Sequence, residues 1–193
     1  MLIQKSYIHY GKYIKGEMLM RYLGICGVSG VGKTTAMHNL IREYPSMFYK
    51  LEQCTTRDIR DNETGDAYLW LNSKRDFYKL EHLLIAKTEV RGELYGTIPE
   101  ERDDQIGILI LNTMGLLDLI NNSQLDRSEY YIVGLDKREA EVVREGRDEA
   151  YLAKEREVLQ YADTVFTLDK GEYVNPKRIM EEVSEYFGLS NED

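Results

Sequence analysis

Residues 27 to 34 read Gly-Val-Ser-Gly-Val-Gly-Lys-Thr, a complete G-x-x-x-x-G-K-[ST] phosphate-binding loop. Such a loop surrounds phosphates with backbone N–H groups, and its glycines leave room for that close approach. We expect Lys33 to reach the β- and γ-phosphates of a nucleoside triphosphate and the Thr34 hydroxyl to bind Mg²⁺. The expected donor-binding residues are Gly27, Ser29, Gly30, Val31, Gly32, Lys33, Thr34 and Thr35.

The flanks of this loop distinguish it from a chance glycine-rich turn. An apolar, strand-like run from Tyr22 to Cys26 leads into it. After it, one helix face is marked by the spacing of Ala36, Met37, Leu40 and Ile41. Strand, loop and helix in this order are the context in which the motif binds phosphate.

The composition is that of a globular protein with one core. The chain has 193 residues, of which 42% are hydrophobic and 31% charged, and this length favours a single domain. No run approaches the roughly 18 apolar residues that a membrane helix needs, and residues 1–17 lack the apolar centre of a signal peptide. With only Cys26 and Cys54 present, neither a disulfide framework nor a metal cluster is expected. We therefore expect a cytoplasmic protein that does not bind a membrane.

The net charge restricts the partners. A formal charge of −9 opposes non-specific binding to DNA or RNA, so no nucleic-acid partner is expected. A small anionic substrate is compatible with this charge, because it needs only a local basic pocket.

Strand-like and helical patterns alternate along the chain. Strands are expected at 22–26, 68–71, 94–97, 106–111, 130–133 and 164–168. Helices are expected after the loop, from a capping box at Ser73 and Asp76 to about 84, over the charged stretch 135–161, and from 175 to 187. This alternation predicts an α/β fold with a parallel sheet flanked by helices.

Three further motifs follow the loop in order. Residues 54–60 read Cys-Thr-Thr-Arg-Asp-Ile-Arg, residues 65–68 read Gly-Asp-Ala-Tyr, and residues 92–97 read Gly-Glu-Leu-Tyr-Gly-Thr. In this order and spacing they resemble the guanylate kinase family, over roughly residues 21 to 187. The resemblance implies a nucleoside monophosphate kinase that uses ATP with Mg²⁺.

The physical character of these motifs agrees with the resemblance. Two arginines three residues apart, Arg57 and Arg60, can converge on one phosphate through their planar donor groups. The hydroxyls of Tyr68 and Tyr95 can add neutral hydrogen bonds. A solvated polar loop remains the alternative for the arginines, and a half-buried strand position the alternative for Tyr68. The acceptor-binding residues implied by the resemblance are Gln53, Arg57, Arg60, Tyr68, Tyr95 and Thr97.

The charged stretch 144–156 resembles the family's lid, whose arginines close over the triphosphate. Arg147 and Arg156 are the candidates in this sequence, and the alternative is an exposed helix laced with salt bridges. The catalytic residues that follow from loop and resemblance together are Lys33, Arg60, Arg147 and Arg156.

Three positions depart from the family's pattern. The glutamate that reads guanine falls on Ala86, a small hydroxyl residue falls on Gln53, and the aspartates after the strand at 106–111 are replaced, so that Asn112 stands at its end. Glu89 could substitute for the missing glutamate only after a local shift in register. The guanine reader is therefore expected to be altered while the phosphate-binding residues are retained.

The resulting prediction is phosphoryl transfer to a nucleoside monophosphate, with GMP or dGMP converted to GDP or dGDP. A same-family kinase for another acceptor and a non-catalytic binding module stay open as alternatives, as does a homodimer.

The resemblance implies a core of residues 18–52, 98–136 and 157–193, an acceptor-binding insertion at 53–97 and a lid at 137–156, with 1–17 as a peripheral extension. A GTPase is disfavoured because no N-K-x-D segment is present, and Thr167 and Asp169 are expected to border the donor base. His9, His38 and His82 are interpreted as incidental.

Overall fold

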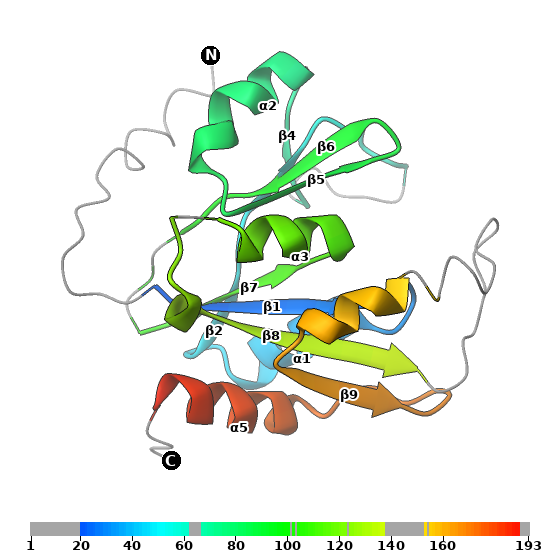
Figure 1. Ribbon diagram of the computed structural model, residues 1–193, viewed down its shortest axis with the longest axis vertical. Coiled ribbons are helices and arrows are strands. Elements are labelled where there is room, and N and C mark those ends of the chain that lie inside the picture. The colour runs from blue at the N-terminus through cyan, green and yellow to red at the C-terminus, as the bar shows by residue number, and fades with distance from the viewer. Residues whose placement is uncertain are drawn as a thin grey trace.

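A five-stranded parallel sheet forms the centre of the molecule (Figure 1). The computed structural model describes residues 20–61, 67–100, 102, 104–122, 124–137, 153 and 155–189. The sheet order is β2 (Phe48–Lys50), β7 (Ile106–Ile110), β1 (Tyr22–Gly27), β8 (Tyr130–Lys137) and β9 (Thr164–Leu168). Every neighbouring pair in it is parallel. The predicted α/β class with a parallel sheet is confirmed.

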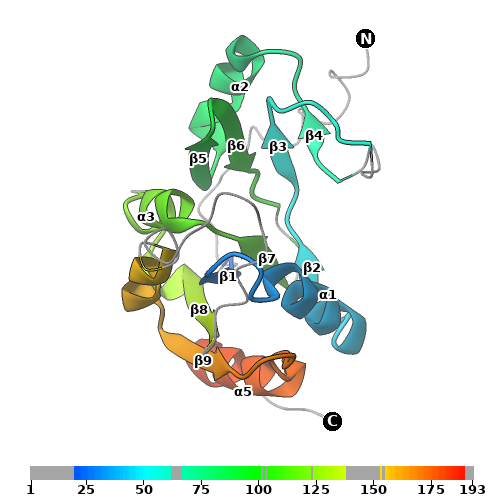
Figure 2. The same ribbon diagram turned by 90° about the vertical axis from the view of Figure 1, so that its right-hand side faces the viewer.

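Helices cover both faces of this sheet, because its strands alternate apolar side chains between two cores. Leu23 and Ile25 of β1 pack toward α1 (Lys33–Glu43) and α5 (Pro176–Phe187). Tyr22 and Cys26 of the same strand pack toward α3 (Thr113–Ile120) and the 3₁₀ helix η4 (Glu157–Tyr161). Figure 2 shows the two helical layers on either side of the strands.

A second, four-stranded sheet lies beside the first, with α3 between them (Figure 1). Its order is β4 (Leu69–Trp70), β3 (Gln53–Thr55), β6 (Glu93–Thr97) and β5 (Ala86–Val90). One face packs on α2 (Lys74–Leu80) and the 3₁₀ helix η2 (Glu81–Leu83), through a small core that includes Cys54, Phe77 and Leu84. The other face carries Gln53, Tyr95 and Thr97, and it is turned toward the phosphate-binding loop.

The predicted helix boundaries are largely confirmed at α2 and α5. Ser73 caps α2 by accepting a hydrogen bond from the Asp76 backbone N–H at 3.2 Å. In α5, Asn175 is the N-cap, Pro176 is in the first turn, and Gly188 ends the helix at a φ of 63°. At its C-terminal end α2 changes at Glu81 into the 3₁₀ helix η2.

The expectation of a helix over 135–161 is wrong at both ends. Strand β8 continues to Lys137, because residues 135–137 pair with β9. Residues 157–161 form a 3₁₀ helix, and residues 138–152 and 154 lie outside the described residues. The sequence patterns also missed the strands β2, β3 and β5 and the helix α3.

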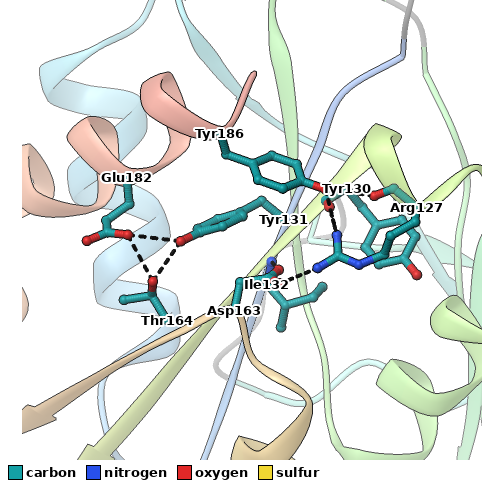
Figure 3. Close-up of polar contacts among 8 residues, drawn as sticks. All are labelled: Arg127, Tyr130, Tyr131, Ile132, Asp163, Thr164, Glu182 and Tyr186. Carbon is teal, nitrogen blue, oxygen red and sulfur yellow. Dashed lines mark hydrogen bonds and ion pairs between the residues drawn. The ribbon is translucent and has the colours of Figure 1, made fainter. Parts of the chain in front are cut away.

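A polar network ties β8 to β9 and α5 at the amino end of the strands (Figure 3). The Asp163 carboxylate accepts a hydrogen bond from the Ile132 backbone N–H at 2.7 Å and pairs with the Arg127 guanidinium. Arg127 also donates to the Tyr186 hydroxyl at 2.8 Å. In the same region the Tyr131 hydroxyl donates to Glu182 at 3.0 Å, and burial raises the pKa of Tyr131 to about 12.

The cysteines behave as buried apolar residues. Both Cys26 and Cys54 are free and buried. Burial raises the pKa of the Cys26 thiol to about 12 and that of Cys54 to about 11. Neither thiol is therefore a nucleophile at neutral pH.

Within the described parts of the chain, every helix is too short or too polar to cross a membrane.

Replacing Asp163 with Ala should destabilise the fold by about 1–3 kcal/mol, because the Ile132 N–H loses its partner, while loss of the half-exposed pair with Arg127 adds little. Asp163→Asn keeps an acceptor for the N–H and should lose clearly less. Urea unfolding followed by circular dichroism measures both. As a control, Arg42→Ala removes an exposed pair with Glu43 and should change stability by less than about 0.5 kcal/mol. Equal stability of Asp163→Ala and the wild-type chain would contradict this account.

Candidate active site

The phosphate-binding loop leaves β1 between β7 and β8, at the carboxyl edge of the central sheet. Three of its glycines have positive φ: 137° at Gly27, 79° at Gly30 and 102° at Gly32. A Cβ at Gly27 would stand 2.0 Å from the Leu135 carbonyl oxygen, so only glycine fits beside β8 there. Because α1 begins at Lys33, directly after the loop, the loop N–H groups and the helix N-terminus together favour an anion.

Lys33 lies across the loop. Its ammonium group donates to the carbonyl oxygens of Gly27 at 2.8 Å and Val28 at 2.9 Å. Thr34 lines a cavity that opens beside the loop. Its hydroxyl can offer one oxygen to a metal ion, with phosphate oxygens and water as further ligands. The described residues contain no group of three or more His, Cys, Asp or Glu that could hold a metal by themselves.

A carboxylate of the chain itself contacts the loop. Oε2 of Glu155 accepts a hydrogen bond from the Ser29 backbone N–H at 2.7 Å. The next residue, Arg156, is fixed at the end of β8, where Nε contacts Asp136 Oδ1 at 3.0 Å and Nη2 donates to the Lys137 carbonyl at 2.8 Å. Glu155 is not among the residues predicted from the sequence, where it is one of many charged residues in the stretch 144–156. Arg147, the other expected lid arginine, lies outside the described residues.

A cavity of about 280 Å³ extends from the loop to the second sheet. Of the expected acceptor-binding residues, it is lined by Gln53, Tyr68, Tyr95 and Thr97. Arg57 and Arg60 are not among the lining residues. The Arg57 guanidinium instead lies over the rings of Tyr68 at 5.6 Å and Trp70 at 5.1 Å, and Arg60 is exposed.

The segment that carries Arg57 is fixed by its two threonines. The Thr55 hydroxyl donates to the Leu94 carbonyl at 2.9 Å and accepts from the Arg57 N–H at 3.2 Å. The Thr56 hydroxyl donates to Glu93 Oε2 at 2.7 Å. These bonds hold the arginine-bearing turn against β6, so the threonines have a structural role that the sequence analysis did not assign.

Three residues lie side by side across the second sheet, at the position where the resemblance to the guanylate kinase family places a side chain that binds the acceptor base. Thr97 pairs with Gln53 on one side and with Ala86 on the other. Ala86 is 2% exposed and offers no hydrogen-bonding side chain. Glu89 does not replace the missing glutamate, because β5 pairs with β6 in regular register, with Glu89 opposite Leu94 and 4.0 Å from Lys74. Glu89 does not line the cavity.

Two residues that the sequence analysis did not list as site residues meet on the cavity wall. Asn112, the N-cap of α3, accepts a hydrogen bond from the Gly115 N–H at 2.8 Å. Its Nδ2 donates to Oγ1 of Thr88, in β5, at 3.2 Å. Thr88 could have been suspected, because a strand from Ala86 places residues 86 and 88 on one face.

Other candidates lie away from this cavity. Thr167 and Asp169 are exposed at the end of β9 and do not line it. His38 and His82 are exposed, as expected for incidental residues, and His9 lies outside the described residues.

Comparisons with known proteins converge on one family. Residues 19–109 match the family model described as guanylate kinase. The chain is 38% identical over 77 residues to a guanylate kinase of Lawsonia intracellularis, covering 39% of this chain and 36% of that protein. It is 32% identical over 98 residues to guanylate kinase 1 of Arabidopsis thaliana, covering 50% of this chain and 25% of that protein. The chain thus spans well under half the length of these two curated relatives.

The fold comparison extends further along the chain than the sequence matches do. A crystal structure of guanylate kinase from Anaplasma phagocytophilum superimposes with a TM-score of 0.61 at 18% identity, covering 88% of this chain and 85% of that one. This likeness establishes a shared fold. Residues 19–109 of this chain are thus similar to guanylate kinases.

Proposed function

We propose that this chain transfers a phosphoryl group from ATP to a nucleoside monophosphate, with GMP and dGMP the first candidates and GDP and dGDP the products. One observation carries the proposal: a single cavity joins the phosphate-binding loop to Tyr68, Tyr95 and Thr97. A donor phosphate and an acceptor phosphate can therefore meet in one cavity. Phosphoryl transfer needs such positioning and charge neutralisation rather than a covalent nucleophile.

At the donor end, the loop N–H groups would hold the triphosphate and the Lys33 ammonium would neutralise the transferring group. Mg²⁺ would bind the Thr34 hydroxyl and phosphate oxygens, and it would supply positive charge where negative charge develops. The buried free cysteines and the nucleotide substrates support a cytoplasmic location.

At the acceptor end, Tyr68 and Tyr95 would bind the monophosphate, joined by Arg57 and Arg60. The rings of Tyr68 and Tyr95 lie 6.3 Å apart, so both hydroxyls can reach one ligand. The guanidinium of Arg57 lies over the ring of Tyr68, which lines the cavity, and it would have to leave this ring to contact a phosphate there. Arg60 would need movement of its turn.

Closure of three parts would complete the site. We assign the core to residues 18–52, 98–136 and 157–193, the acceptor-binding part to 53–97 and the lid to 137–156, with 1–17 as an extension. In this scheme Arg147 and Arg156 approach the phosphates as the lid closes. Closure would exclude water and so limit hydrolysis of ATP.

A kinase of the same family with another acceptor is the second candidate. Ala86 favours it, because it gives guanine no carboxylate partner. A purely non-catalytic binding module is disfavoured, because the loop keeps both Lys33 and Thr34 at the cavity.

Replacing Lys33 with Ala should lower turnover by about 100-fold or more, because the transferring phosphate loses its neutralising charge. The assay is coupled ADP release with Mg·ATP and a panel of ribo- and deoxyribonucleoside monophosphates. Lys177→Ala, an exposed change on α5, serves as the matched control and should keep full activity. Near-normal turnover by a folded, contaminant-free Lys33→Ala protein would refute the mechanism.

Replacing Glu155 with Gln should tighten ATP binding about five-fold, because the carboxylate competes with phosphate for the Ser29 N–H and that contact is worth ~1 kcal/mol. Isothermal titration calorimetry gives the Kd. Glu157→Gln removes the same charge two residues away, at an exposed position, and should leave the Kd unchanged. Equal ATP affinity of Glu155→Gln and wild type would show that the carboxylate does not compete.

A further inference from the structure

We propose that residues 1–17 of this chain bind in a groove between α2, β5 and α3, outside the active-site cavity. Figures 1 and 2 show these three elements side by side in this order. The groove has a volume of about 500 Å³. The lining residues that carry the inference are Tyr78 of α2, Glu81 of η2, Glu89 of β5, and Met114, Leu117 and Asp118 of α3. This inference goes beyond the proposed function and does not depend on it.

Strand β5 lies between the groove and the active-site cavity. Lys87 and Thr88 border both spaces, whereas Tyr78, Glu89 and Met114 line the groove alone. A nucleotide in the cavity therefore leaves these three side chains uncovered, and the groove needs an occupant of its own.

Two large apolar side chains of the groove are exposed. Tyr78 is 57% exposed and Met114 is 61% exposed. Behind them, Phe77 and Leu94 also line the groove and are buried in the small core of the second sheet. Tyrosine and methionine are enriched at protein interfaces, and a methionine side chain adapts its shape to a partner. The groove thus offers two apolar contacts above a packed floor.

The groove is acidic. The three carboxylates of Glu81, Glu89 and Asp118 line it together with one ammonium group, that of Lys87. This ammonium already pairs with Glu81 at 2.7 Å, and Asp118 accepts a hydrogen bond from the Lys87 backbone N–H at 2.9 Å. The lining residues keep a net negative charge, which favours a positively charged occupant.

Residues 1–17 have the complementary chemistry. They contain three lysines, Lys5, Lys12 and Lys15, and one acidic residue, Glu17, so this segment is positively charged in a chain with a net charge of −9. The apolar and aromatic residues around these lysines are Leu2, Ile3, Tyr7, Ile8, Tyr10, Tyr13 and Ile14. A basic segment rich in apolar side chains matches an acidic groove with exposed apolar contacts.

The segment joins the described chain close to the groove. Met20, the first described residue, packs against the same core cluster as Ile120, the last residue of α3, and the groove includes the next residue, Asn121. Residues 1–19 can span up to about 60 Å when extended. Because they are tethered, their effective concentration at the groove is on the order of mM, so even weak contacts favour them over a separate partner.

The test uses the full chain with a nitroxide spin label attached to Ser6→Cys. Cys26 and Cys54 are fully buried, so the label reacts with the introduced thiol. The readout is the NMR signal of the Met114 methyl group in protein with ¹³C-labelled methionine methyl groups, assigned with Met114→Leu. Docking should cost this signal at least about half of its intensity. Met180 packs in the cluster on the other face of the central sheet and should keep its signal.

Two double variants locate the contact. Tyr78→Lys with Glu89→Lys changes exposed groove residues and should restore the Met114 signal, because it removes an apolar contact and reverses a charge. Lys12→Glu with Lys15→Glu should restore it from the side of the segment. The matched control is Tyr161→Lys with Glu157→Lys, which makes the first pair of changes at exposed positions of η4, outside the groove, and should leave the loss of signal unchanged.

The inference is overturned if the label leaves the Met114 signal as intense as that of Met180, or if the groove variant leaves it as weak as in the unchanged chain. An excess of unlabelled chain shows which molecule supplies the segment. Docking within one chain survives this dilution, whereas recovery of the Met114 signal would assign the groove to the segment of a second copy and overturn the proposal. Phosphoryl transfer is tested by the separate activity assay, so either proposal can fail without the other.

Discussion

Backbone N–H groups that converge on one small space favour a bound anion there. The arrangement of residues at the carboxyl edge of the central sheet depends on this preference. The loop at residues 27–34 reaches this geometry only because Gly27 passes so close to β8 that a Cβ would collide with Leu135. The two neighbours of β1 then place their own ends beside the loop, with Asn112 after β7 and Asp136 near the end of β8. The polar face of the second sheet forms the opposite wall of the cavity. The order of the strands in the sheet thus places backbone N–H groups, side chains that follow β7 and β8, and the polar face of the second sheet around one site for an anion, and this makes phosphoryl transfer possible.

The two ends of the cavity differ in the kind of constraint they impose. At the loop, main-chain donors and one lysine would hold phosphate, which every nucleotide carries. At the far wall, side chains from β5, β6 and the start of α3 are neutral, and their hydrogen-bond directions are set by contacts outside the cavity. The phosphate-binding end and the far wall of the cavity thus rest on different elements of the fold.

Much of this arrangement could be predicted from the sequence, and the misses have physical causes. The phosphate-binding loop is a local motif, so the sequence alone identifies it. Tyr68, Tyr95 and Thr97 line the cavity, and their binding of an acceptor stays a prediction. The position of Arg57 could not be predicted, because stacking on Tyr68 and Trp70 depends on tertiary contacts. Strand β5 was missed because three residues of its Ala-Lys-Thr-Glu-Val sequence, Ala, Lys and Glu, are depleted in strands, and its pairing with β6 is a tertiary contact. Without β5, the meeting of Thr88 with Asn112, 24 residues away, had no basis in sequence.

The contact between Glu155 and Ser29 also bears on the many small anions that share a cell with nucleotides. Inorganic phosphate does not find the Ser29 N–H free, because this N–H already donates to the Glu155 carboxylate. An anion that binds there must first displace this carboxylate of the same chain. A single phosphate would gain little over that carboxylate, whereas a triphosphate would add contacts to Lys33, Thr34 and the start of α1. The carboxylate on the Ser29 N–H would thus raise the number of contacts that a ligand must make in order to remain bound.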